Sequence, residues 1–170
     1  MGHFGSKSFI LKPMSIDNPN GIFIGNRVMI QQYVWLASCS LNKDKAELVI
    51  SDGVQLGHFN HIYSTKRIVL EKDVLTADRV YIGDVRHSYS DVYQPIIKQE
   101  TVNLGTVTVG EGSWIGENTC IIGANIGKHC VIGANSVVTH DIPDYSVAVG
   151  SPAKVIKSYN FQKKCWECTV

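Results

Sequence analysis

The chain has 170 residues, of which 44% are hydrophobic and 18% charged, and its formal net charge at pH 7 is +1. This length suits one domain with a proper hydrophobic core, and the small net charge gives no support for binding to nucleic acid or to a membrane surface. No apolar run approaches the roughly 20 residues that a transmembrane helix needs. Five cysteines and the absence of a signal-peptide pattern favour free thiols, so we expect a cytoplasmic protein.

Residues 1–20 contain turn signals at Pro13 and at Asn18-Pro19-Asn20, together with the short apolar segment Phe9–Leu11. Terminal units of repeat arrays are atypical in sequence, because one of their faces has no neighbour. We therefore expect these residues to form an N-terminal cap over the open end of the repeats that follow.

Aliphatic residues then recur at a spacing near six, first from Ile22 to Leu36 and again from Ile50 to Ile82. A helix would repeat apolar residues near every 3.6 positions and a half-buried strand every two, so neither template accounts for the pattern. The polar stretch between Ser38 and Glu47 separates the two runs and is predicted to be a surface loop.

The repeat stops at Asp84, and almost no trace of it is found before Gly105. This interruption contains His87 and Pro95 and is predicted to be one long extruded loop over about residues 84–106. Long loops within compact domains usually carry function.

The repeat is clearest between residues 109 and 138, where its period is six with a single five-residue step. Its aliphatic positions are Val109, Ile115, Ile121, Ile126 and Ile132. Self-similarity at six residues indicates a parallel β-helix of stacked triangular coils, whose large aliphatic side chains point inward. Glycine often follows the aliphatic residue, and we expect it to supply the unusual φ of a corner. The prediction is a single all-β domain over residues 1–170, with the β-helix at 21–151.

A turn at His140–Asp144 and an apolar segment at Val147–Ile156 follow the repeats. Pro152 stands where a helix could begin, so residues 152–170 are predicted to form a short C-terminal helix or a departing tail. Cys165 and Cys168 in this segment form a lone CxxC, which without a partner pair is a weak signal for zinc or redox chemistry.

Five segments together resemble the left-handed hexapeptide-repeat acyltransferases, in particular bacterial O-acetyltransferases of capsule, exopolysaccharide and O-antigen sugars. They are the repeat itself, Gly112–Gly116, Val131–Thr139, Ile142-Pro143 with Gly150–Ile156, and His87-Ser88-Tyr89 with Pro95-Ile96 and Gln99. The resemblance covers about residues 22–156. The family's catalytic loop usually reads Asp-His-x-His, whereas this chain has Asp84-Val85-Arg86-His87, with Val85 in place of the first histidine.

This resemblance implies acetyl transfer from acetyl-CoA to a sugar hydroxyl in surface polysaccharide biosynthesis, by direct attack without a covalent enzyme intermediate. His87 is the candidate general base, since an imidazole has an unperturbed pKa of about 6.5. Asp84 would orient the imidazole, or would be an ordinary turn residue. Backbone N–H groups of a neighbouring coil would stabilise the oxyanion. The acceptor sugar is free, nucleotide-linked or lipid-linked.

The resemblance also implies a homotrimer, with acetyl-CoA between neighbouring prisms and no metal. Residues that match groove-lining positions in relatives are Glu117, Ala134, Thr139 and His140, and Lys154 and Lys157 would meet the CoA phosphates. Trp114 and Tyr89 are candidate contacts for the sugar, because aromatic faces suit sugar rings. Packing alone would explain Ala134 and Trp114 equally well, and a solvated tail would explain the lysines.

Two other activities stay open at this point. The same fold and cofactor would serve an N-acetyltransferase acting on a nucleotide-linked amino sugar. His58, His61 and His87 raise a second alternative, since β-helix carbonic anhydrases bind zinc through three histidines between subunits. The spacing of three between His58 and His61 places them on different parts of a coil, which disfavours zinc. His129 and Cys130 occupy regular repeat positions and are predicted to be structural.

Overall fold

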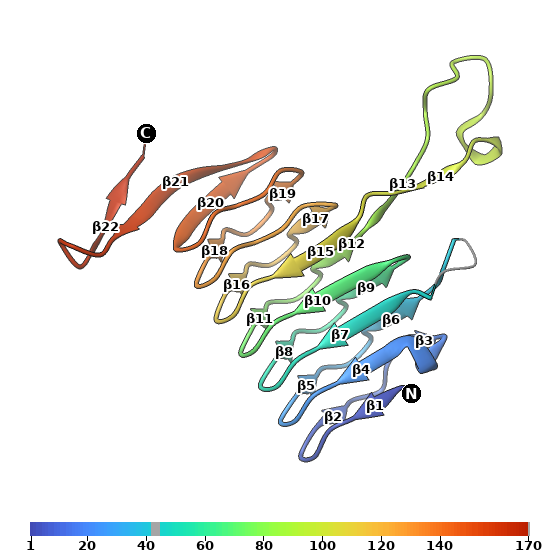
Figure 1. Ribbon diagram of the computed structural model, residues 1–170, viewed down its shortest axis with the longest axis horizontal. Coiled ribbons are helices and arrows are strands. Elements are labelled where there is room, and N and C mark those ends of the chain that lie inside the picture. The colour runs from blue at the N-terminus through green and yellow to red at the C-terminus, as the bar shows by residue number, and fades with distance from the viewer. Residues whose placement is uncertain (42–44, 170) are drawn as a thin grey trace.

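The computed structural model describes residues 1–41 and 45–169 (Figure 1). Residues 42–44 of the predicted loop at 38–47, and Val170, lie outside the described residues. None of the helices in the described ranges has the length and apolar character that a membrane span requires.

The chain winds as a left-handed parallel β-helix of three faces, as the repeat predicted. Face A consists of β1 (His3–Phe4), β4 (Ile22–Ile24), β7 (Glu47–Ile50), β10 (Arg67–Leu70) and β15 (Thr106–Val109). Face B begins with β2 (Phe9–Ile10), β5 (Met29–Ile30), β8 (Gln55–Leu56), β11 (Leu75–Thr76), β16 (Trp114–Ile115) and β18 (Val131–Ile132). Face C consists of β3 (Ser15–Asp17), β6 (Trp35–Ser38), β9 (His61–Ser64), β12 (Tyr81–Gly83), β17 (Cys120–Ile122) and β19 (Val137–Val138).

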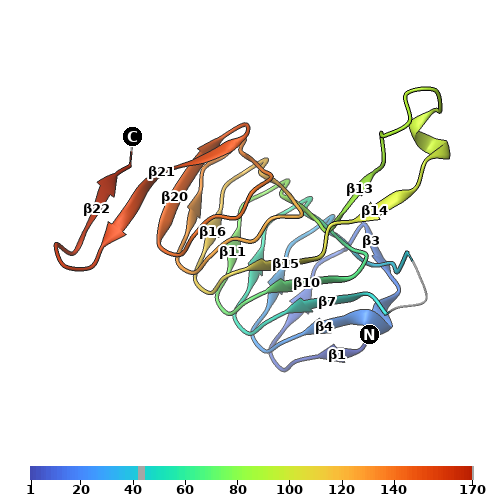
Figure 2. The same cartoon turned by 45° about the horizontal axis from the view of Figure 1, so that its top comes forward.

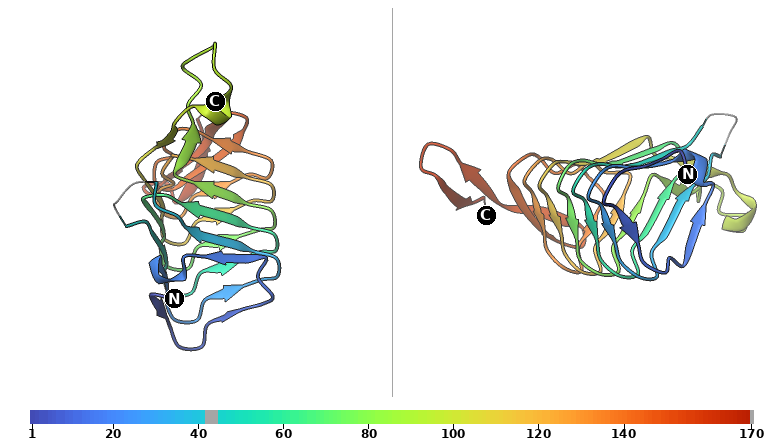
Figure 3. Two further views of the ribbon diagram at one scale, coloured as in Figure 1. Left: turned by 90° about the vertical axis from the view of Figure 1, so that its right-hand side faces the viewer. Right: turned by 90° about the horizontal axis from the view of Figure 1, so that it is seen from below.

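On each face, an internal strand pairs in parallel with the strands one coil before and one coil after it, so equivalent side chains stack along the axis. Ile62, Ile82 and Ile121 form one such inward row on face C, and all three are fully buried. Comparable rows on the other faces complete an aliphatic core inside the coils. Figure 3 shows how these coils stack along the prism axis. The inward aliphatic positions are thus the ones that the six-residue period predicted.

The glycines that follow aliphatic residues serve close packing between coils and not an unusual φ. A Cβ at Gly127 would lie 2.4 Å from the backbone nitrogen of Asp144, and one at Gly110 would lie 2.5 Å from the backbone carbon of Gly127. Positive φ at the corners falls mostly on other residues, such as Phe59 and Arg79 at 57° and 56°. The predicted role of these glycines in the corners was therefore wrong, because backbone proximity and not turn geometry excludes a side chain.

Carboxylates stabilise the corners in a recurring way. The side chains of Asp52, Asp78 and Asp144 each accept the backbone N–H of a residue one coil earlier, at distances of 2.8 Å in all three cases. Corner N–H groups that have no strand partner are satisfied by these carboxylates. An aspartate at a corner therefore has a structural reason to be present.

The N-terminal segment differs from the prediction. β1, β2 and β3 pair in register with β4, β5 and β6, so residues 3–17 form the first coil of the stack and not a separate cap. Their repeat is hard to recognise because this coil has a neighbour on one side only, and Phe4 and Phe9 remain exposed.

The C-terminal segment is a tail of antiparallel strands and contains no helix in its described part. β20 (Ser146–Gly150) pairs with β21 (Ala153–Asn160), which pairs with β22 (Cys165–Cys168). The Ser151–Pro152 peptide bond is cis and lies in the tight turn between β20 and β21, where no helix begins. These strands continue face B beyond the prism (Figure 1).

Candidate active site

Within the described residues, one long segment leaves the prism, at the corner between faces C and A. It runs from the end of β12 to the start of β15 and contains β13 (Val85–His87), η2 (Ile96–Lys98) and β14 (Thr101–Asn103). We call residues 84–105 the arm. Figure 2 shows that the arm projects from the side of the prism, as the interruption of the repeat predicted.

His87 lies on the arm, opposite Thr101 in the antiparallel β13–β14 ladder. Its side chain is exposed and hydrogen-bonds to no described residue, so both ring nitrogens are free to meet a substrate. Tyr89 is also exposed, and the Arg86 guanidinium lies 5.1 Å from the centroid of its ring. The arm thus presents the Arg86 guanidinium, the His87 imidazole and the Tyr89 phenol within a short stretch of chain.

The Asp84 carboxylate does not contact the His87 imidazole directly, because its hydrogen bonds go to the preceding coil. The carboxylate is fully buried and accepts hydrogen bonds from Thr65, Lys66 and Arg67, on the corner one coil earlier. Val85 and Arg86, the two residues between Asp84 and His87, lead outward along the arm, away from that corner. Asp84 thus caps the corner at the base of the arm.

Thr139 and His140 lie on the same C–A corner as the base of the arm, two coils further along. Both are exposed, and Oγ1 of Thr139 is 3.1 Å from Nδ1 of His140. A groove of about 520 Å³ adjoins this corner on face A, and its lining includes Thr108, Asn125 and Asp141. The structure therefore brings Thr139 and His140 to the side of the prism from which the arm departs.

Sequence reasoning missed this groove, although one signal pointed to it. At the five-residue step, Ile126 makes only isolated bridges to Val109 and Ile142 instead of a strand. Face A is hollowed at this level, where Gly110, Gly127 and the bridge residues Ile126 and Ile142 are part of the groove lining.

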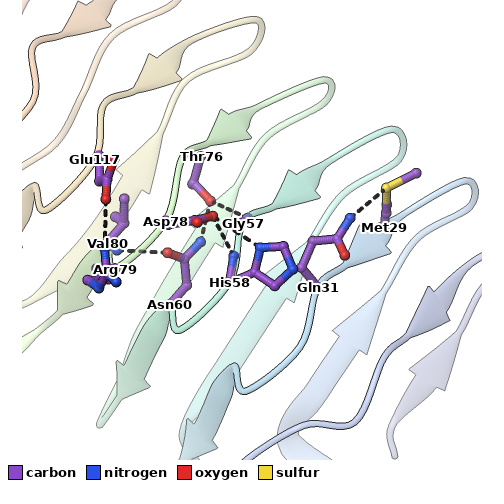
Figure 4. Close-up of polar contacts among 10 residues, drawn as sticks. All are labelled: Met29, Gln31, Gly57, His58, Asn60, Thr76, Asp78, Arg79, Val80 and Glu117. Atoms are coloured by element: carbon purple, nitrogen blue, oxygen red, sulfur yellow. Dashed lines mark hydrogen bonds and ion pairs between the residues drawn. The ribbon is translucent and has the colours of Figure 1, made fainter.

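Glu117 and Ala134 lie on a different corner, between faces B and C. They are exposed on adjacent coils, and the backbone N–H of Asn135 donates to the carbonyl of Glu117. The Glu117 carboxylate forms an ion pair with Arg79 at 2.7 Å (Figure 4). This carboxylate is therefore already paired in the single chain.

Trp114, Lys154 and Lys157 belong to face B and its continuation. Trp114 is exposed beside Leu75, its partner in the β11–β16 register. The two lysines are exposed on β21, opposite Val149 and Val147 of β20. The predicted site residues thus form two groups, one with the arm on the C–A corner and one around face B, and a single prism does not bring the groups together.

The three histidines of the carbonic anhydrase alternative, His58, His61 and His87, do not form a cluster in the single chain. His58 lies at the B–C corner, where its Nδ1 is 3.3 Å from Oδ1 of Asp78 (Figure 4). His61 points outward from face C and stacks on Trp35. Within the described ranges, no three His, Cys, Asp or Glu side chains are grouped closely enough to hold a metal ion.

Comparison with known proteins identifies the repeat and its relatives. The family described as the hexapeptide repeat of succinyl-transferase matches residues 106–140. WbbJ of Escherichia coli strain K12, provisionally named a lipopolysaccharide biosynthesis O-acetyl transferase, is 39% identical over 127 residues, which are 71% of this chain and 65% of WbbJ. The chain therefore spans just under two thirds of the length of this curated relative.

Solved structures agree in fold. The hexapeptide-repeat acetyltransferase of Vibrio cholerae in complex with acetyl coenzyme A has a TM-score of 0.59 and 26% identity, over 92% of this chain and 70% of that one. AntD, an N-acyltransferase of Bacillus cereus in complex with dTDP and 3-hydroxybutyryl-CoA, has a TM-score of 0.80 and 22% identity, over 95% and 85% of the chains. At that identity the likeness to AntD concerns the fold alone.

Proposed function

Since residues 106–140 match the hexapeptide repeat of succinyl-transferase and WbbJ is 39% identical, we propose that the chain is a hexapeptide-repeat acyltransferase and transfers acetyl from acetyl-CoA to a hydroxyl group of a sugar. The observation that carries this proposal is the arm, which interrupts the repeat and holds one exposed imidazole, His87, away from the prism. The relative named as an O-acetyl transferase of lipopolysaccharide biosynthesis supports an acceptor among surface polysaccharide precursors. An enzyme that consumes acetyl-CoA would act in the cytoplasm.

In the proposed step, a ring nitrogen of His87 takes the proton of the sugar hydroxyl as its oxygen attacks the thioester carbonyl. The carbon–sulfur bond then breaks, the acetyl group stays on the sugar oxygen, and the CoA thiolate leaves with the proton from the imidazolium. A positioned base of this kind contributes on the order of 10² to 10⁴ in rate. The free ring nitrogens of His87 suit this role, since no described residue occupies them.

Acetyl-CoA would lie along the coils between neighbouring prisms, as the family resemblance implies. Thr139 and His140 are exposed beside the groove on face A, and backbone N–H groups of these coils are candidates for stabilising the oxyanion. Exposed Lys154 and Lys157 would neutralise phosphate charge. Trp114 and Tyr89 would contact the sugar.

Both groups of candidate residues would meet if a second prism lay against the first, and we propose the homotrimer of the family. The tip of the arm supports an inter-subunit contact, because Val92, Tyr93 and Ile97 are 84%, 94% and 88% exposed there. Large apolar side chains clustered at the end of a projecting arm indicate a protein contact. In such an assembly the arm of one copy would reach Glu117, Ala134 and Trp114 of the next.

The proposal is tested by incubating the purified protein with acetyl-CoA and a panel of free, nucleotide-linked and lipid-linked sugars while free CoA is measured. Release that depends on a sugar lacking an amino group supports O-acetylation. No release with any acceptor would contradict the proposal.

A second candidate function is N-acetylation of a nucleotide-linked amino sugar. AntD, whose fold matches this chain closely, is named an N-acyltransferase and was solved with dTDP. Release of CoA only with amino sugars in the same panel would favour this activity over O-acetylation.

A further inference from the structure

We propose that Asp84, together with Thr65 and Asn103, forms a clamp that fixes the direction of the arm and makes Asp84 a positioning residue for His87. This inference rests on the proposed function, since it assigns residues that act through the general base. It concerns contacts at the base of the arm, where the chain leaves the prism and where it returns.

The outgoing limb of the arm is held through the Asp84 carboxylate. Oδ1 accepts the backbone N–H and the hydroxyl of Thr65 at 2.6 and 2.8 Å, and Oδ2 accepts the backbone N–H groups of Lys66 and Arg67 at 2.8 and 3.0 Å. Three consecutive N–H groups that converge on one anion form a nest, and hydrogen bonds to a carboxylate are about twice as strong as neutral ones. The carboxylate is 0% exposed, so water cannot replace these donors.

The returning limb is fastened to the same corner. Nδ2 of Asn103 donates to Oγ1 of Thr65 at 2.7 Å, and the backbone N–H of Leu104 donates to the carbonyl of Asp84 at 2.7 Å. Oδ1 of Asn103 accepts the backbone N–H of Gly105 at 2.9 Å. Thr65 therefore bridges the two limbs, and both are tied to one turn of the preceding coil.

The position of His87 depends on this base. Val85 pairs with Asn103, which belongs to the clamp, and His87 pairs with Thr101 at the far end of the same β13–β14 ladder. The rest of the arm projects into solvent in the single chain (Figure 3). A tilt at the base would therefore move the imidazole, and a displacement near 1 Å can cost on the order of 10² in rate.

The hydrogen bonds of the Asp84 carboxylate exceed those that a corner carboxylate makes elsewhere in the described chain. The corner carboxylates of Asp52, Asp78 and Asp144 each accept one backbone N–H from the coil before. Asp84 accepts three and is the one at which the arm begins. The additional bonds coincide with the only long excursion in the described chain.

The test compares Asp84→Asn with Asp52→Asn, which neutralises a corner carboxylate far from the arm. We expect Asp84→Asn to lower kcat at least tenfold, with KM for acetyl-CoA changed less than threefold, and to speed amide hydrogen exchange at residues 85–87 and 101–103 at least tenfold. Asp52→Asn should leave kcat and arm exchange unchanged. If Asp84→Asn fails to fold, Asn103→Ala leaves the Asp84 carboxylate in place and removes the bond to Thr65 and the local bond to Gly105. It should speed exchange in the same residues.

Each outcome is informative. Faster arm exchange with unchanged kcat would overturn the positioning role, and unchanged exchange would overturn the clamp. A wild-type protein without acetyl transfer would contradict the proposed function and the positioning role that depends on it, while arm exchange in the variants would still decide whether the clamp exists.

Discussion

The imidazole of His61 lies flat against the indole of Trp35, with the ring centroids 4.1 Å apart and the planes inclined by 4°. Tyr81 packs against the same imidazole edge-on at 5.2 Å. Nε2 of His61 is buried and bonds to no described residue. Burial lowers the pKa of His61 from 6.5, and the Asp17 carboxylate opposes this effect more weakly. The folded protein therefore favours the neutral ring.

This contact predicts a pH dependence of stability. With a folded pKa below the unfolded value of 6.5, His61 binds fewer protons in the folded state, so its contribution is complete above pH 6.5 and is lost as pH falls below it. His61→Phe keeps the stacking and should flatten the decline in unfolding free energy between pH 7 and pH 5, as measured by urea denaturation. It should also stabilise the protein by about 1 kcal/mol at pH 7, because a buried polar atom without a partner is removed. His3→Phe, at an exposed position, is the control, and equal slopes for wild type and His61→Phe would refute the assignment.

The general-base role predicts that His87→Ala lowers kcat by at least about 10² while the oligomer stays intact. The reason is that the sugar hydroxyl would lose its proton acceptor, whereas β13 would keep its backbone pairing. Free CoA release measures turnover, and light scattering measures the assembly. His58→Ala is the control, a partly exposed histidine at the B–C corner whose Nδ1 lies 3.3 Å from Oδ1 of Asp78. Near-normal turnover in His87→Ala would remove His87 from the mechanism.

The proposed assembly predicts that the apolar tip of the arm is buried between subunits. Tyr93→Ser combined with Ile97→Ser should shift the protein toward monomer in sedimentation velocity. It should also lower kcat, because each active site would lose the residues that the neighbouring subunit contributes. The unfolding midpoint of the isolated prism should hardly change, because both side chains are exposed in the single chain. A fully assembled double variant would contradict the proposed contact.

The alternation of face C predicts opposite outcomes for two adjacent isoleucines. Ile121 points into the core and is fully buried, whereas Ile122 points outward and is partly exposed. Ile121→Ala should cost about 2–5 kcal/mol of unfolding free energy, as cavity-forming substitutions do, and Ile122→Ala less than about 1.5 kcal/mol. Urea denaturation of both variants measures these losses. Similar losses of unfolding free energy in the two variants would contradict the assignment of Ile121 as the inward-pointing residue.

The six-residue period alone was enough to predict the fold of this protein. Each short strand must place one aliphatic side chain inside the triangular prism, so aliphatic residues recur regularly in the sequence. Ile62, Ile82 and Ile121 could be assigned to the core from spacing alone. The arm could also be predicted from the sequence, because an interruption of the six-residue repeat stands out between two regular stretches. The first coil was not, because residues such as Phe4 and Phe9 have a neighbouring coil on one side only and are free of that constraint.

The tertiary structure alone decided what the polar residues do. Asp84 lies three positions before His87 in the chain, yet its carboxylate bonds to Thr65 on the preceding coil, because stacking brings together residues about one coil apart. For the same reason Thr139 lies on the corner that carries the arm while Glu117 lies on another. Hydrophobic spacing is a local property that a sequence displays directly, whereas hydrogen-bond partners across coils depend on the length of every corner between them.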